Sequence, residues 1–309
     1  MKNKKNSSPI LSIIVPTRDS IKLLGNFIDS IKNTVFDKNN IELVFVVDKD
    51  DQKTITFLKG HSYINDMKFV QLLIRPQSTN FSRDYYTYGA KHATGVFVMP
   101  GADDLKFNTK HFDSILIQTE KDLKPDPNGC DPPTKFYLLT VTGPLESVVT
   151  EISPSYTMGI TITGDVPSDI SLPMLKFCCF PILTKESIDL LGFFLAPEEV
   201  PGWGADWVID QIYRMADRII ETTPPIEILH DSWHAGNRDV LSTIRHRRMK
   251  RISESTVSPQ VNDEVILKLT EATVKLKNAI HGLEHKWSTR AIKHAVAVEH
   301  VKKQKKDNI

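Results

Sequence analysis

Short apolar runs alternate with amphipathic stretches over the first hundred residues of the chain. Residues 11–16 and 41–47 are mostly apolar and rich in β-branched side chains, and polar residues follow each run at once. Runs of this kind predict buried strands, and apolar positions three and four residues apart between the runs predict helices. Strands that alternate with helices are typical of parallel βαβ units. The pattern therefore predicts an α/β fold with a mostly parallel sheet flanked by helices.

The same periodicities place further elements along the chain. Strands are expected over residues 68–74, 95–100, 135–141 and 156–163, the last two as an antiparallel addition to the sheet. Helices are expected over residues 21–31, 82–93, 108–121 and 183–191, and from Asp206 onward. Prolines mark residues 124–134 as a loop, and the chain from Val240 onward has a polar, helical pattern.

Composition is that of an ordinary globular protein with 40% hydrophobic and 25% charged residues. The three cysteines have no Cys-x-x-Cys spacing, which argues against a disulfide framework or a zinc site and favours a reducing, cytoplasmic location. No stretch of 18 consecutive apolar residues predicts a transmembrane segment. We expect a flexible N-terminus over residues 1–9, one α/β domain over 10–240 and a helical extension over 241–309.

Charge is distributed unevenly between the domain and its extension. Residues 242–309 carry a net charge of +8, whereas residues 1–241 carry −7, which gives the whole chain +1. A basic tail often meets phosphate-bearing polymers or anionic membrane surfaces, although a solvated helical face has the same composition.

Polar side chains follow three of the predicted strands. Thr17 and Arg18 follow the first, Asp48 follows the second, and the adjacent pair Asp103 and Asp104 follows the fourth. Ligands bind at the carboxyl edge of open α/β sheets, where these residues are expected to meet. Two adjacent carboxylates repel each other, and Mg²⁺ or Mn²⁺ is a usual compensation. An acidic turn that caps the next helix is the alternative interpretation.

Five short segments resemble the nucleotide-sugar glycosyltransferases of the GT-A fold, in particular those similar to family 2. They match in order over residues 10–240, and they are Ile14-Val15-Pro16-Thr17, Val46-Val47-Asp48, Ser82-Arg83-Asp84, Ala102-Asp103-Asp104 and Ala205-Asp206-Trp207. The resemblance implies a Rossmann-like, mostly parallel mixed sheet, a nucleotide-sugar donor such as a UDP-sugar, and a glycan or lipid-linked acceptor. Residues 10–240 would then be a GT-A glycosyltransferase domain that transfers the sugar with inversion.

The resemblance also implies roles for individual residues. The donor nucleotide would contact Pro16, Thr17, Arg18, Asp48, Arg83 and Asp103. Mn²⁺ or Mg²⁺ would be held by Asp103, Asp104 and a late histidine, His234. Asp206 would be the general base, flanked by Trp203 and Trp207 as a platform for the acceptor. Each aspartate has a simpler alternative as a strand-end or helix cap, Arg83 as an exposed helix arginine, and His234 as a packed histidine.

Two departures from the family pattern leave other functions open. Gly101 and Ala205 stand where the family commonly has acidic residues, which is compatible with a non-catalytic nucleotide-sugar-binding or scaffold protein. The basic tail, with clusters at residues 245–251 and 302–306, is compatible with a glycosyltransferase that acts on hydroxymethylated bases of DNA.

Overall fold

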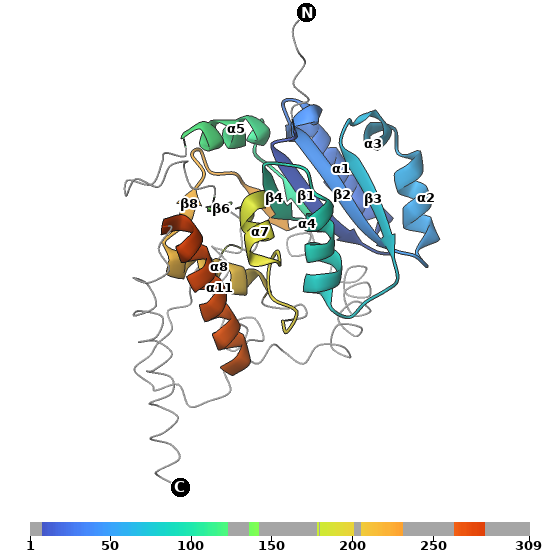
Figure 1. Cartoon of the computed structure of the whole chain (residues 1–309). Coiled ribbons are helices and arrows are strands. Elements are labelled where there is room, and N and C mark those ends of the chain that lie inside the picture. The colour runs from blue at the N-terminus through green and yellow to red at the C-terminus, as the bar shows by residue number, and fades with distance from the viewer. Residues whose placement is uncertain are drawn as a thin grey trace, which may run out of the picture.

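The chain folds as a mixed sheet with helices packed on it (Figure 1). The computed structural model describes residues 8–122, 136–141, 178, 180–200, 205–230 and 263–281. The strands are β1 (Leu11–Thr17), β2 (Ile41–Asp48), β3 (Val70–Arg75), β4 (Phe97–Pro100), β5 (Leu105–Phe107), β6 (Leu138–Thr140), β7 (Ile182–Thr184), β8 (Ile219–Glu221) and β9 (Ile228–His230). The α-helices are α1 (Ile21–Thr34), α2 (Gln52–Gly60), α3 (Ser62–Asp66), α4 (Tyr88–His92), α5 (Phe112–Asp122), α7 (Lys185–Leu191), α8 (Ala205–Ala216) and α11 (Asp263–His281). A 3₁₀ turn, η1 (Lys38–Asn40), precedes β2, and a π-helical segment, η2 (Ser82–Thr87), precedes α4.

The main sheet has seven strands in the order β3-β2-β1-β4-β7-β6-β8 among the described residues. β3, β2, β1 and β4 are parallel to one another, whereas β7 runs antiparallel to both β4 and β6. β6 and β8 are parallel, and β5 pairs with β9 in a separate antiparallel ribbon. The predicted α/β class and mostly parallel sheet are therefore confirmed, and β6 joins through an antiparallel partner as expected.

Some predicted boundaries are wrong. The helix expected over residues 183–191 begins only at Lys185, because residues 182–184 form β7 between β4 and β6. The helix expected from residue 108 begins at Phe112 as α5, and the preceding strand β5 was not predicted, nor were β8 and β9. The predicted loop at 124–134 and strand at 156–163 lie outside the described residues.

The strand order creates a switch point between β1 and β4. The chain moves from β1 outward to β2 and β3, and then returns to place β4 on the opposite side of β1. Right-handed crossovers put α1 and α2 on one face of the sheet and α4 on the other. α4 lies directly on β1 and β2, since a Cβ added to Gly89 would lie 2.4 Å from Ile14 Cγ2. The carboxyl ends of β1 and β4 lie side by side at this point, which is where open α/β sheets bind ligands.

Helix α11 packs on the body of the protein. Its apolar side buries Val265, Leu269, Leu276 and Ile280 against α7 and α8, as the crossing of α11 over α8 in Figure 1 shows. This segment of the basic extension is therefore part of the hydrophobic core, while the division of the chain at residue 240 stays a prediction. In the described ranges, no helix has both the length and the apolar character that a membrane crossing requires.

Candidate active site

Thr17 and Asp103 meet at the switch point. Thr17 ends β1, Asp103 follows β4, and the Thr17 hydroxyl donates a 2.8 Å hydrogen bond to Asp103 Oδ2. Both side chains are buried. The predicted convergence of the strand ends is confirmed, because the polar residues that follow β1 and β4 form a direct contact across the switch point.

Asp48, the last residue of β2, is held by two donors. Arg18 Nη1 donates to Asp48 Oδ2 at 2.8 Å, and the Tyr85 hydroxyl donates to Asp48 Oδ1 at 2.5 Å. The two terminal nitrogens of Arg18 also donate hydrogen bonds to the exposed carboxylate of Asp50, at 2.5 and 2.7 Å. The hydrogen bonds to Asp50 and Asp48 raise the pKa of Arg18 above its ordinary value. These hydrogen bonds hold the Asp48 side chain in a fixed position at the carboxyl edge of the sheet.

Two consecutive tyrosines of the π-helical segment η2 lie at this edge. Tyr85 reaches Asp48, and the Tyr86 hydroxyl donates to the carbonyl oxygen of Gly101 at 2.9 Å. Phe81 stacks on Tyr85 with ring centroids 4.6 Å apart. A π-helix has more residues per turn than an α-helix, so the side chains of consecutive residues diverge less, and π-helical turns are common at functional sites. Sequence reasoning missed both tyrosines, although the cluster of aromatic residues from 81 to 88 was a visible signal.

Gly101 has no room for a side chain. A Cβ at this position would lie 2.7 Å from Ile13 Cγ2 and 3.1 Å from the carbonyl oxygen of Ile14. An acidic residue at position 101 would require the Ile13 side chain to shift and its neighbours on β1 to give way slightly. The carboxylates of this loop are therefore confined to Asp103 and Asp104, both of which are largely buried.

Asp103 and Asp104 have the chemistry for a divalent cation but do not form a complete site by themselves. They supply carboxylate oxygens, the ligands that Mg²⁺ and Mn²⁺ prefer. In the part of the chain that the structure describes, no group of three metal-ligating residues occurs. The predicted ligand His234 lies outside the described residues.

Asp206 is the second residue of α8. Its Oδ1 accepts a 3.0 Å hydrogen bond from the backbone N–H of Trp207. Burial raises the pKa of Asp206 to about 6, the nearby charge of Asp210 adds to the rise, and the Trp207 N–H opposes it. Although part of its surface remains exposed, protein atoms crowd the carboxyl group. A carboxylate with a pKa near 6 is suited to accept a proton at neutral pH.

Asp210, one turn further along α8, has a structural role. It is buried, accepts a 2.5 Å hydrogen bond from Arg214 Nε and a 3.2 Å bond from the backbone N–H of Cys178. Trp207 is partly buried against the hydrophobic core, and Trp203 lies outside the described residues. In the described ranges, no hydrogen bond or ion pair joins Asp206 to Thr17, Asp48 or Asp103.

The remaining predicted donor contacts lie on β1 and η2. Pro16 is buried in β1, in register with Val46 of β2. Arg83 is half-exposed on the first turn of η2 and forms ion pairs with Asp84 at 3.0 Å and Glu198 at 3.3 Å. Arg83 therefore points to the segment 191–199, while Tyr85, two residues later, contacts Asp48.

Comparison with solved structures identifies this architecture. One similar structure is TarS 1–349 from S. aureus, with 15% identity, 87% of this chain and 80% of that chain covered, and a TM-score of 0.49. The same TarS fragment in complex with UDP-GlcNAc has 15% identity, 87% of this chain and 81% of that chain covered, and a TM-score of 0.47. A third is the mannosyltransferase PcManGT from Pyrobaculum calidifontis in complex with GDP-Man and Mn²⁺, which is 16% identical, with a TM-score of 0.50 over 94% of this chain and 76% of that chain. The chain has the GT-A fold. In this fold, Thr17 and Asp103 lie at the switch point between β1 and β4. No family model matches the sequence, and no curated protein matches it.

Proposed function

We propose that this protein is an inverting, divalent-metal-dependent glycosyltransferase that moves a sugar from a UDP-linked donor to a hydroxyl of a glycan or lipid-linked acceptor. The observation that carries the proposal is the meeting of Thr17, Asp103 and the fixed carboxylate Asp48 at the carboxyl edge of a GT-A sheet. The similar PcManGT structure contains GDP-Man and Mn²⁺, which supports a nucleotide-sugar donor and a metal.

The donor nucleotide would bind along the ends of β1 and β2. Asp48 would accept a hydrogen bond from the imino N–H of the base, and the Arg18 guanidinium beside it would donate to a neighbouring base carbonyl. Thr17 and the backbone at Pro16 would line the same pocket, and Asp103 would contact the ribose or the metal. Arg83 stays a candidate for the diphosphate, since a guanidinium matches phosphate oxygens.

Asp104, with Asp103, would hold the cation. When bound, Mg²⁺ or Mn²⁺ neutralises the negative charge that develops on the leaving diphosphate, a contribution of several kcal/mol. The hydrogen bond from Thr17 fixes Asp103 in place before the donor arrives, so that the carboxylate pays no reorientation cost during the reaction.

Asp206 would take the proton from the acceptor hydroxyl. The hydroxyl oxygen then forms a bond to the anomeric carbon from the face opposite the diphosphate. The bond between that carbon and the diphosphate oxygen breaks, and its electron pair leaves with the diphosphate. Trp207 and Trp203 would contact the acceptor. The residues that suggested DNA as an acceptor lie outside the described ranges.

The proposal is tested by incubating the full chain with a panel of UDP- and GDP-sugars in Mn²⁺ or EDTA. Release of free nucleoside diphosphate from at least one donor is expected, and EDTA should abolish it. A matching donor at 100 times its Kd should also stabilise the fold by about 2.7 kcal/mol. Stabilisation without release, even with acceptors present, would favour the non-catalytic interpretation, and neither effect with any donor would contradict the proposal.

Removing single hydroxyl groups from η2 should separate base binding from metal binding. Tyr85→Phe removes a hydrogen bond to a charged acceptor and is expected to weaken UDP binding about tenfold. Tyr86→Phe removes a neutral hydrogen bond to Gly101 and should instead raise the Mn²⁺ concentration needed for half-maximal activity, by about fivefold. Titrations of UDP and Mn²⁺ on both variants measure the two effects. Equal losses of UDP affinity and of Mn²⁺ affinity in both variants would mean that the tyrosines only stabilise the fold.

A further inference from the structure

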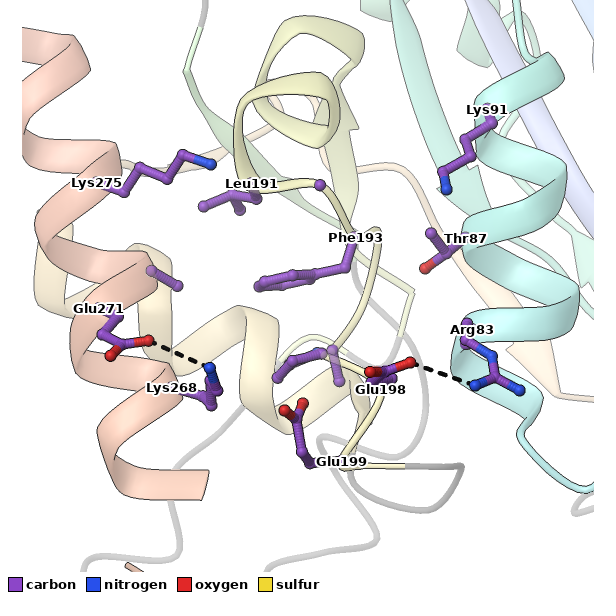
Figure 2. A pocket seen from close by; sticks show the side chains of 14 residues that line it. Arg83, Thr87, Lys91, Leu191, Phe193, Glu198, Glu199, Lys268, Glu271 and Lys275 are labelled. Atoms are coloured by element: carbon purple, nitrogen blue, oxygen red, sulfur yellow. Dashed lines mark hydrogen bonds and ion pairs between the residues drawn. The ribbon is translucent and has the colours of Figure 1, made fainter. Parts of the chain in front are cut away.

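A pocket of about 440 Å³ lies beside α4, outside the strand-end site described above (Figure 2). Its walls come from η2 and α4 on one side and α11 on the other, and the segment 191–199 forms its floor. Volumes from 300 to 1,000 Å³ are typical of small-molecule sites. The pocket is therefore large enough for a sugar and its substituents.

Two lysines face this pocket and form no ion pair with any residue that the structure describes. Lys91 comes from α4 and Lys275 from α11, on opposite walls in Figure 2. Within the described ranges, neither forms an ion pair, whereas the other two cations of the pocket are paired: Arg83 with Glu198 at 3.3 Å, and Lys268 with Glu271 at 3.5 Å. The two ammonium groups therefore place positive charge on both walls of the pocket.

Part of the floor of the pocket is apolar. The ring of Phe193 projects into the space between the walls, and the buried side chains of Leu191 and Ala272 lie beside it. A pyranose ring has an apolar C–H face that can cover such a surface, and its hydroxyl groups can donate to the exposed carboxylate of Glu199. Three lining carboxylates, Glu198, Glu199 and Glu271, would repel a polyphosphate chain, so a ligand with a single anionic group fits better.

We propose that this pocket binds an anionic saccharide, with its phosphate or carboxylate attracted by the charges of Lys91 and Lys275 and its ring on Phe193. The inference rests on the proposed function, in which the saccharide is part of the acceptor. The segment that forms the floor precedes α8 in the sequence, and Glu199 precedes Asp206 by seven residues. A bound saccharide would therefore contact the segment that carries the chain to the proposed base.

Direct binding tests this site without any donor. We expect the full chain to bind glucose 6-phosphate or glucuronate at least tenfold more tightly than glucose in isothermal titration. Lys91→Gln and Lys275→Gln should each weaken the tighter of these two ligands about tenfold, the effect of one charge-assisted hydrogen bond. The matched control Lys59→Gln, an exposed lysine at the end of α2, should change nothing. Phe193→Leu should weaken glucose 6-phosphate but not inorganic phosphate.

Three results would overturn the inference. The first is that neither anionic sugar binds more tightly than glucose, and the second is that the lysine variants bind like wild type. The third is that inorganic phosphate binds as tightly as glucose 6-phosphate and Phe193→Leu has no effect, which would leave an anion site only. UDP binding in Mn²⁺, measured on the same proteins, reports on the donor site. If the wild-type chain bound the anionic sugar but not UDP, the result would contradict the proposed function and not the sugar pocket.

Discussion

Replacing Asp206 with asparagine is expected to lower turnover about 10²–10⁴-fold, the usual contribution of general acid–base catalysis. The amide has nearly the same shape and its oxygen can still accept the hydrogen bond from the Trp207 N–H, so α8 should keep its start. UDP affinity should stay near wild type, because the base acts on the acceptor. Rate and donor affinity are measured on the same preparation, with Asp217→Asn, just beyond the end of α8, as the matched control.

The pH dependence of the reaction should follow Asp206. Because its pKa is raised to about 6, kcat/KM should rise tenfold per pH unit below 6 and level off above it. Stability should change in the opposite sense. The folded protein binds the Asp206 proton more tightly than the unfolded chain does, so this contribution to stability is present at low pH and is lost between about pH 4 and 6.

Asp206→Asn should therefore melt at least as high as the wild type at pH 7, where the wild-type carboxylate is ionised and partly desolvated. A lower melting temperature together with lost UDP binding would show that Asp206 is a structural cap or a donor contact. A rate profile that keeps its inflection near pH 6 in the variant would assign the base to another residue.

Replacing Asp104 with asparagine is expected to remove metal-dependent donor binding. The amide keeps the volume of the side chain but loses the charge, and the loss of a charged contact of about 3 kcal/mol weakens binding about 10²-fold. Isothermal titration of UDP with and without Mn²⁺ measures the effect. UDP affinity in EDTA should match that of the wild type, which shows that the nucleotide pocket remains intact.

A matched control is Asp66→Asn, an exposed aspartate on α3 paired with Lys38. It should bind UDP and Mn²⁺ as the wild type does. If Asp104→Asn retained the full stimulation by Mn²⁺, the cation would have to be held elsewhere, and Asp104 would be no more than part of the turn after β4.

The sequence predicted the elements whose partners are dictated by a repeating local pattern. β1 and β2 are long, apolar runs, and their parallel pairing brings Thr17 and Asp48 to one edge regardless of how the rest of the chain folds. β7 could not be predicted in the same way. It has only three residues, it continues directly into α7, and it becomes a strand because β4 and β6 lie on either side of it.

The candidate site shows the same division. The convergence of Thr17 and Asp103 follows from the parallel strands that carry them. The hydrogen bond from Tyr85 to Asp48 instead depends on the π-helical path of η2, which the periodicity of apolar residues does not reveal. Gly101 illustrates a third case. The sequence alone marked this position as a missing acid, and only the structure shows that a Cβ there would lie within 2.7 Å of the Ile13 side chain.

The packing of α11 on α8 has a consequence for the order of events during synthesis. The parallel strands β1 to β4 can pair once about the first hundred residues have left the ribosome, but α8 can pack against α11 only after residues 263–281 have followed. The donor half would thus be assembled before the half that carries Asp206. In nascent chains stalled before residue 263, β1 to β4 should resist protease while α8 is still cut. Such an unfinished chain would bind the nucleotide without transferring the sugar.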